Sequence, residues 1–263
     1  MEFRKVVAIV TGGGRGFGRA FAEEILACHG KVMITDINLY ELEATGKELR
    51  RKHGEKNVCW DCQDVTAKDS FPRAFEYASN HFRTPVNVLV NNAGIAGDLT
   101  FYDSKSTTWE NVINIDLTAL IRGTQFAIGE FKRTLNGEEG VIVNLSSMAS
   151  LFPVPFSPVY AAAKAGVTGF TRSLYQLKKS DNIRCFGMCP AFAETEMGRS
   201  ADKDAPEYTK MMGGLLPVKV VVDAFAAGMR ESDNAGRMLR ITSKGTVYNR
   251  FPGDQTLFPN SKL

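Results

Sequence analysis

Two residues four positions apart, Tyr160 and Lys164, have the types needed for acid–base chemistry. At this spacing in a helix both side chains project from one face. A tyrosine is a poor base, because its ordinary pKa is about 10. A lysine ammonium held about 4 Å away would favour the phenolate by up to about 4 kcal/mol at an effective dielectric constant near 20. That energy corresponds to roughly 3 pKa units, so the pair predicts a general acid–base site.

A glycine-rich segment follows the first apolar run and precedes an amphipathic stretch. Glycines at such a point permit a tight turn and let backbone N–H groups approach a pyrophosphate at the N-terminus of a helix. The segment therefore predicts a dinucleotide-binding loop made of Gly12, Arg15, Gly16, Phe17 and Gly18.

Two residues of opposite charge bear on the choice of dinucleotide. Asp36 ends the second apolar run, beside Ile37, where a carboxylate can accept hydrogen bonds from a ribose diol and would repel a 2′-phosphate. Arg15 favours the opposite choice, since a basic residue in the loop can face that phosphate. We expect Asp36 to outweigh the flexible arginine and the cofactor to be NAD. The alternative is an NADPH-dependent carbonyl reductase.

The elements that must position these residues alternate along the chain. Helical patterns separate short β-branched runs, which implies a doubly wound parallel α/β sheet with helices on both faces. No repeat or linker divides the chain, so we expect a single domain over residues 1–263. The predicted strands are 5–11, 31–36, 57–62, 86–91, 140–146, 183–189 and 237–242, and the predicted helices are 16–29, 40–53, 67–82, 109–135, 159–178 and 218–230.

The composition of the 263 residues excludes several classes of protein. With 44% hydrophobic residues and a net charge of +3, the chain does not have the composition of a disordered protein. Its 32 basic residues are balanced by 29 acidic ones, so we expect no nucleic-acid partner. No apolar run approaches the ~18 residues that cross a bilayer, and we expect no membrane span. The N-terminus enters a strand directly and does not resemble a signal peptide.

The cysteines and histidines predict neither a disulfide framework nor a metal site. Cys59 and Cys62 form a C-x-x-C pattern, but no second pair or histidine cluster completes a tetrahedral site. We therefore expect five free thiols and no metal. Surface or capping roles are expected for His29, His53 and His81.

The order and spacing of the motifs over about residues 5–200 resemble the short-chain dehydrogenase/reductase family. They are T-G-x-x-x-G-x-G from Thr11, N-N-A-G over 91–94 and Y-x-x-x-K from Tyr160, with Ser147 thirteen residues before the tyrosine. The resemblance implies a Rossmann fold and hydride transfer between a nicotinamide and an alcohol or ketone. It also implies that Tyr160 is the general acid/base, assisted by Lys164, and that Ser147 polarises the substrate oxygen.

The resemblance also implies further contacts to the cofactor. Asp64 and Val65 correspond to the pair that holds the adenine ring, and Gly94 is expected beside the adenine site. The remaining expected contacts at the end of the fourth strand are Asn92 and Ala93. Within the family, the segments 136–160, 169–173 and 241–245 resemble the hydroxyprostaglandin dehydrogenases.

Asp116 departs from the family pattern, which has an asparagine seven residues after a tryptophan, here Trp109. The family residue works mainly through its backbone carbonyl, so Asp116 can still serve. Its carboxylate would add negative charge near Lys164 and keep the pKa of Tyr160 higher, which predicts an alkaline optimum for oxidation. Asp116, together with Ala191 in place of a family glycine, leaves a nucleotide-binding protein with weakened catalysis as an alternative.

The segment after the sixth predicted strand is expected to complete both sites. By resemblance, Pro190, Ala193 and Thr195 help to hold the nicotinamide, and residues 191–217 form a substrate lid. Methionines and leucines in the lid suit an apolar, shape-tolerant pocket and a hydrophobic secondary alcohol or ketone. The expected substrate contacts are Ser147, Phe152, Ser157, Tyr160 and Phe192.

The remaining features of the sequence bear on the oligomeric state and the subcellular location. Small residues on the predicted helix 159–178 allow close packing of a second helix, and the resemblance implies a homodimer, with a tetramer as the alternative. The final Ser261-Lys262-Leu263 matches an address read by the peroxisomal import receptor, and without it a cytoplasmic location is expected. Residues 252–263 are expected to form an irregular, exposed tail. The small residues are Ala161, Ala162, Ala163, Ala165, Gly166 and Gly169.

Overall fold

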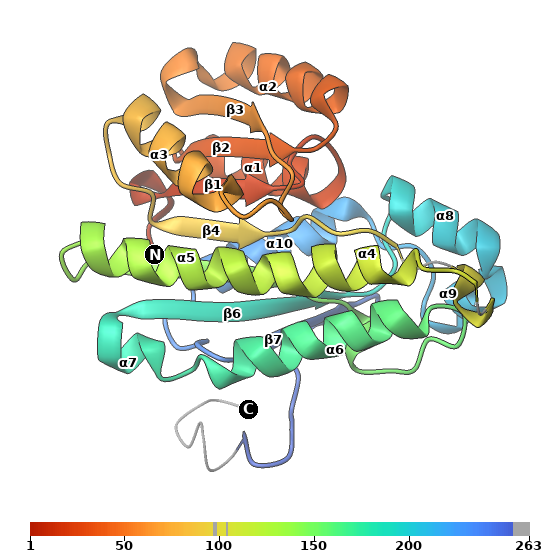
Figure 1. Cartoon of the computed structure of the whole chain (residues 1–263). Coiled ribbons are helices and arrows are strands. Elements are labelled where there is room, and N and C mark those ends of the chain that lie inside the picture. Colours follow the sequence, from red (N-terminus) through yellow and green to blue (C-terminus); the bar gives the residue numbers. More distant parts are fainter. Residues whose placement is uncertain (97–98, 104, 255–263) are drawn as a thin grey trace.

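The computed structural model describes residues 1–96, 99–103 and 105–254. Its strands form one sheet of eight in the order β3-β2-β1-β4-β5-β6-β7-β8, and only the pairing of β8 with β7 is antiparallel (Figure 1). The predicted doubly wound α/β fold is confirmed. The strands are β1 Val7–Thr11, β2 Lys31–Asp36, β3 Val58–Cys62, β4 Val88–Asn91, β5 Gly140–Leu145, β6 Ile183–Pro190, β7 Met238–Thr242 and β8 Gly245–Tyr248.

Helices cover both faces of the sheet. In Figure 1, α4, α5 and α6 lie in front of the strands, whereas α10 lies behind them. The longer helices are α1 Gly16–Ala27, α2 Leu39–His53, α3 Ser70–Phe82, α5 Leu120–Thr134, α6 Pro158–Ser173 and α10 Val218–Arg230. The shorter ones are α4 Trp109–Ile113, α7 Leu177–Asp181, α8 Glu196–Asp204 and α9 Pro206–Met211.

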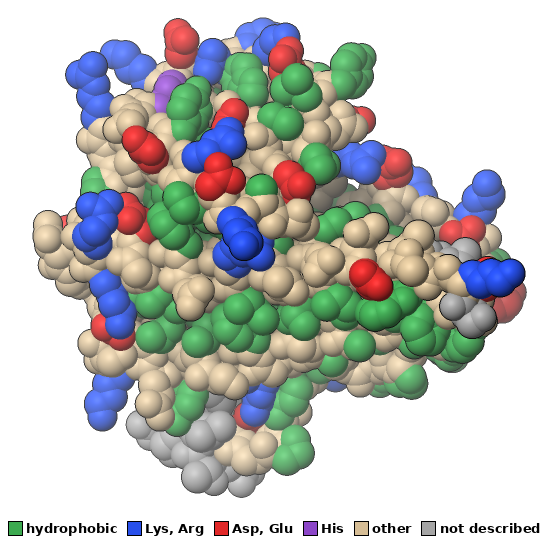
Figure 2. All heavy atoms as spheres, viewed as in Figure 1, with side chains coloured by type: hydrophobic (Ala, Val, Ile, Leu, Met, Phe, Trp, Pro, Cys, Tyr) green, Lys and Arg blue, Asp and Glu red, His purple; other side chains and the backbone are tan. Residues whose placement is uncertain are grey.

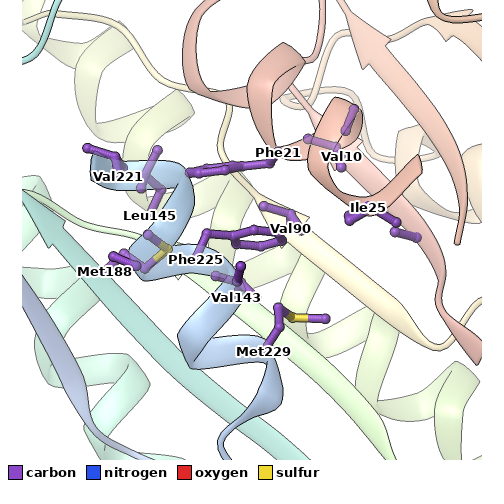
Figure 3. Close-up of a cluster of buried hydrophobic side chains, with 14 of the residues drawn as sticks. Val10, Phe21, Ile25, Val90, Val143, Leu145, Met188, Val221, Phe225 and Met229 are labelled. Atoms are coloured by element: carbon purple, nitrogen blue, oxygen red, sulfur yellow. The ribbon is translucent and has the colours of Figure 1, made fainter. Parts of the chain in front are cut away.

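A hydrophobic cluster lies on each side of the sheet, and the strands contribute to both. Within β4, Val88 and Val90 belong to one cluster and Leu89 to the other. A strand buried on both faces has no polar side to show, which explains its continuous apolar sequence. In the cluster of Figure 3, Phe21 from α1 and Phe225 from α10 stack with ring centroids 4.5 Å apart.

Several predicted helices differ from the structure in their bounds. The expected helix 109–135 is interrupted by a π-helical segment, Asn114–Ala119, between α4 and α5. The expected helix 159–178 ends at Ser173 and the chain becomes helical again at α7. The stretch after β6, in which no helix was predicted, contains α8 and α9. The prediction also missed β8, a four-residue edge strand whose mostly exposed side chains show no apolar alternation.

The beginning of the predicted tail is anchored to α6. Asp254 forms an ion pair of 2.8 Å with Arg172, and the Arg172 guanidinium lies 3.8 Å from the centroid of the Phe251 ring. Asp254 is buried, so the expectation of an exposed tail is wrong for this residue. Ser261-Lys262-Leu263 lie outside the described residues. Among the helices described, none is both long and apolar enough to cross a membrane.

Candidate active site

A cavity of about 610 Å³ opens at the carboxyl ends of the central strands. The chain reverses its winding direction between β1 and β4, and crevices at such switch points bind ligands in doubly wound sheets. The cavity extends from the end of β2, past the glycine loop and the N-terminus of α6, to α8 and α9. It therefore brings most of the predicted nucleotide and substrate residues into one continuous space.

The glycine loop forms one wall of the cavity. Gly12 has a φ of +64°, and a Cβ there would lie 2.9 Å from Ala93 Cα, so the position requires glycine. Gly18 does not line the cavity, contrary to its expected place at the phosphates. A Cβ on Gly18 would lie 2.2 Å from Gly12 O, so this glycine lets α1 pack against the loop. The loop residues that do line the cavity are Gly12, Arg15, Gly16 and Phe17.

Asp36 is held in place at the end of β2 and lines the cavity beside Ile37. Its carboxylate accepts hydrogen bonds from the backbone N–H groups of Gly14 and Asn38, both at 3.0 Å. Free lone pairs of such a fixed carboxylate can accept from a ribose diol. Ile37 is 68% exposed, which leaves its side chain available to cover an adenine ring.

The end of β3 completes this part of the cavity. Asp64 accepts hydrogen bonds from the N–H and the hydroxyl of Thr66, and Val65 packs beside it. The sequence interpretation missed Gln63, which also lines the cavity. The side-chain amide of Gln63 is buried and has no hydrogen-bond partner within the described part of the chain. A buried amide without partners fits a site that is completed by a polar ligand.

The end of β4 connects the nucleotide end to the catalytic end. Asn92 donates hydrogen bonds from Nδ2 to the carbonyl oxygens of Thr11 and Gly12, at 2.8 and 3.0 Å. A Cβ on Gly94 would lie 3.0 Å from Asp116 Oδ2 and 3.4 Å from Lys164 Nζ. Gly94 therefore lies beside Asp116 and Lys164 and lines the cavity, and its contact with the adenine stays a prediction.

Tyr160, Lys164 and Ser147 meet in the cavity, as the spacing of the motifs predicted. Lys164 Nζ lies 5.4 Å from the centroid of the Tyr160 ring and donates a hydrogen bond of 3.2 Å to Leu145 O. The Ser147 hydroxyl lines the cavity beside Tyr160 and accepts a hydrogen bond from the N–H of Ala149. Two hydroxyls and an ammonium therefore line the same part of the cavity.

The carboxylate of Asp116 lies beside Lys164, as the sequence predicted, in addition to the backbone role that the resemblance implies for this position. Its Oδ2 lies 2.9 Å from Lys164 Nζ, and its Oδ1 accepts a hydrogen bond of 2.9 Å from Ile95 N–H. Asp116 and Lys164 are 1% and 4% exposed, so the ion pair is buried. Asp116 lies within the π-helical segment, whose wider turn alters the register of the following residues.

Burial and neighbouring charges shift the titration of these groups. Burial raises the pKa of Tyr160, and the charge of Asp116 raises it further, whereas Lys164 and the Ser147 hydrogen bond lower it. The net pKa of Tyr160 is above its ordinary value, in contrast to the lowering that the lysine alone predicts. Burial lowers the pKa of Lys164, but Asp116 and Tyr160 outweigh it, so the ammonium is retained.

An aromatic wall closes the other end of the cavity. The rings of Phe156 and Phe192 meet the ring of Tyr208 edge to face, with centroids 5.1 and 6.2 Å from it. The Tyr208 hydroxyl donates to Pro153 O at 2.6 Å, so the ring presents its apolar part to the cavity. The sequence analysis missed Tyr208. Nothing in the sequence of residues 205–212 indicates which side chain faces the loop between β5 and α6.

The predicted substrate residues differ in their positions. Phe192 and Ser157 line the cavity, and the Ser157 hydroxyl is buried with no partner among the described residues. Phe152 is not among the residues that line the cavity and is 45% exposed, so the structure does not bring it together with the other predicted substrate residues. It lies in the turn after the 3-10 segment Met148–Ser150, and the chain turns inward only at Val154.

The segment after β6 places the predicted nicotinamide residues against the cavity. Pro190, Ala193 and Thr195 all line it. The Thr195 hydroxyl accepts from Gly198 N–H at 3.1 Å and caps α8. A backbone hydrogen bond of 2.8 Å from Leu216 to Phe192 closes the base of the expected lid.

The C-x-x-C residues do not act together. Cys59 is buried in β3, which raises the pKa of its thiol to about 12, whereas Cys62 is exposed. No group of three or more candidate metal-ligating side chains occurs among the residues described.

Comparisons with known proteins identify the family of the chain. The sequence model of the short chain dehydrogenases matches residues 6–206. Human 15-hydroxyprostaglandin dehydrogenase (NAD(+)) is 34% identical over 265 residues, which cover 95% of this chain and 96% of that protein. The resemblance to the hydroxyprostaglandin dehydrogenases is thus confirmed.

Solved structures share the architecture. The 3-ketoacyl-(acyl-carrier-protein) reductase from Brucella melitensis, complexed with NADH, is 26% identical with a TM-score of 0.79; the match covers 90% of this chain and 97% of that one. A variant of actinorhodin polyketide ketoreductase, with NADPH, has a TM-score of 0.82 at 23% identity, over 91% of this chain and 97% of that one. The second likeness shows the fold alone.

Proposed function

The chain belongs to the short-chain dehydrogenase family, and we propose that it transfers a hydride between a hydrophobic secondary alcohol or ketone and NAD. The observation that carries the proposal is the convergence of Tyr160, Lys164 and Ser147 at one end of a cavity whose other end is lined by Asp36. Two observations fit a dinucleotide. Gly12 lets the glycine loop pack closely against the backbone of Ala93, and the buried side-chain amide of Gln63 has no hydrogen-bond partner among the described residues.

Each catalytic side chain has a separate task. When bound, the nicotinamide supplies the acceptor or donor for the hydride. In oxidation, the Ser147 hydroxyl holds the substrate oxygen by a hydrogen bond, and Tyr160 Oη takes the proton of the substrate hydroxyl. Lys164 stabilises the phenolate that accepts this proton, and Asp116 holds the lysine. In reduction the same proton returns from Tyr160 to the carbonyl oxygen.

The preference for NAD is supported by the fixed carboxylate of Asp36, which is suited to a ribose diol. The human relative also carries NAD(+) in its name. The second candidate, an NADPH-dependent carbonyl reductase, is favoured by Arg15 in the glycine loop.

The hydrophobic substrate class is supported by the wall opposite the catalytic hydroxyls. Phe156, Phe192, Tyr208 and Met212 present apolar surface to the cavity, and binding of an apolar group there removes it from water. The Ser157 hydroxyl leaves one polar contact for the substrate at this end.

The test is a screen of hydrophobic secondary alcohols and their ketones with NAD(H) and NADP(H), read by nicotinamide absorbance. We expect turnover with NAD that Tyr160→Phe abolishes while the dinucleotide still binds. A clear preference for NADPH would support the reductase. Binding without turnover of any compound would support a nucleotide-binding protein with weakened catalysis.

We also propose a homodimer formed through α5 and α6. Figure 2 shows hydrophobic side chains gathered in a band along these helices. Ala163 is buried within the protomer, and Gly166 packs against Leu117 of the same chain. A partner subunit would therefore contact the small residues of α6 that are exposed. These are Ala162, Ala165 and Gly169. Analytical ultracentrifugation tests the proposal, and a monomer at micromolar concentration would refute it.

The peroxisomal location is proposed from Ser261-Lys262-Leu263 alone. In eukaryotic cells, a fluorescent fusion that ends in this tripeptide is expected to enter peroxisomes. Deletion of Leu263 should leave it in the cytoplasm. Import of the deleted form would refute the address.

A further inference from the structure

An ion pair joins the glycine loop to the lid. The Arg15 guanidinium, which precedes α1, contacts the carboxylate of Glu196, the first residue of α8. The neighbouring residues meet as well, since a Cβ on Gly16 would lie 3.7 Å from Thr195 Cγ2. Arg15 and Glu196 both line the cavity, 181 positions apart in the chain.

The ion pair with Glu196 orients the Arg15 guanidinium. Asp36 has backbone partners of its own, the N–H groups of Gly14 and Asn38. Among the ion pairs described, Arg15 has Glu196 as its partner and none with Asp36. The guanidinium is thus held toward the lid and away from the carboxylate at which the ribose is expected.

A 2′-phosphate on that ribose needs a nearby cation, commonly an arginine, whereas a free diol needs a carboxylate. We propose that Glu196 is a specificity residue: it withholds Arg15 from the 2′-phosphate and so strengthens the preference for NAD over NADP. The inference rests on the proposed function and deepens it, because the chain carries both a carboxylate and a cation that bear on this choice.

The size of the effect follows from the exposure of the pair. The Arg15 and Glu196 side chains are 54% and 71% exposed. Exposed ion pairs are worth up to about 1 kcal/mol, so their loss changes a binding ratio by up to about fivefold. Asp36 remains in place, and the preference is therefore expected to weaken rather than to reverse.

The experiment measures the Kd of NADH and of NADPH by nicotinamide fluorescence, with no alcohol present. In Glu196→Gln we expect the ratio of the NADPH Kd to the NADH Kd to fall by about threefold to fivefold. The matched control is Glu194→Gln, which removes an exposed carboxylate from the same wall and should leave the ratio unchanged. In an Arg15→Gln background, Glu196→Gln should have no further effect.

Three results would overturn the inference. They are an unchanged ratio in Glu196→Gln, an equal fall in Glu194→Gln, and a fall that persists without the Arg15 guanidinium. The last two would mean that the general charge of the wall acts, and not the ion pair. Failure of the wild-type protein to bind either dinucleotide would instead overturn the proposed function, so the two failures are distinguishable.

Discussion

Replacing Asp116 with asparagine is expected to shift the pH profile of alcohol oxidation toward acid. Asp116 Oδ2 lies 2.9 Å from Lys164 Nζ, which lies 5.4 Å from the centroid of the Tyr160 ring. The carboxylate is therefore within about 8 Å of that ring, where unit charges interact by about 2 kcal/mol at an effective dielectric constant of 20. Because the charge of Asp116 raises the pKa of Tyr160, its removal lowers that pKa.

The assay is kcat/KM for oxidation as a function of pH. Tyr160 accepts the substrate proton as a phenolate, so kcat/KM rises as the pH passes the pKa of Tyr160. A lower pKa moves this rise to lower pH. The matched control is Asp204→Asn, which removes an exposed carboxylate of α8 from the same cavity and should leave the profile in place.

An unchanged profile, an alkaline shift, or an equal shift in Asp204→Asn would refute this reasoning. The substitution also leaves the buried Lys164 ammonium without its carboxylate, and breaking such a pair costs about 3–5 kcal/mol. Thermal unfolding therefore accompanies the kinetics. If the asparagine variant does not fold, Asp116→Glu provides the test, because it keeps the charge and should keep the alkaline profile.

Three further predictions concern packing and the substrate end. In denaturant titration, Gly18→Ala should lower the free energy of unfolding by more than about 1 kcal/mol, because the added Cβ would lie 2.2 Å from the Gly12 carbonyl oxygen. The control Gly129→Ala places its Cβ in open space and should be neutral or stabilising. Tyr208→Phe loses the hydrogen bond to Pro153 O but keeps the ring, so KM for the alcohol should rise a few-fold with kcat little changed in steady-state assays. Arg184→Met removes the fully buried guanidinium that donates to Gly228 O and Met229 O and pairs with Glu139. These acceptors keep Asn234 Nδ2, the Met1 ammonium and Lys178 as second donors, so calorimetry should show a loss of about 1–3 kcal/mol.

The sequence by itself was sufficient for the fold and for most of the cofactor loop. Alternating strands and helices follow from local periodicity, and a run such as Val88 to Val90 is apolar because both faces of the sheet are buried. The glycine loop, Asp36 and the pair Tyr160 and Lys164 are short-range features, whose relative geometry is set by one turn or one helix. Such features can be recognised without knowing what packs against them.

Only the tertiary structure decided which side chains meet across the cavity. The sequence placed the charge of Asp116 near Lys164, but the periodicity of residues 109–135 does not reveal the π-helical segment from which the two form a direct ion pair. Tyr208 joins the aromatic wall from a helix that the sequence interpretation missed, and Glu196 reaches Arg15 from 181 positions away. These contacts depend on how packed elements are oriented relative to one another, and local propensity carries no information about that orientation.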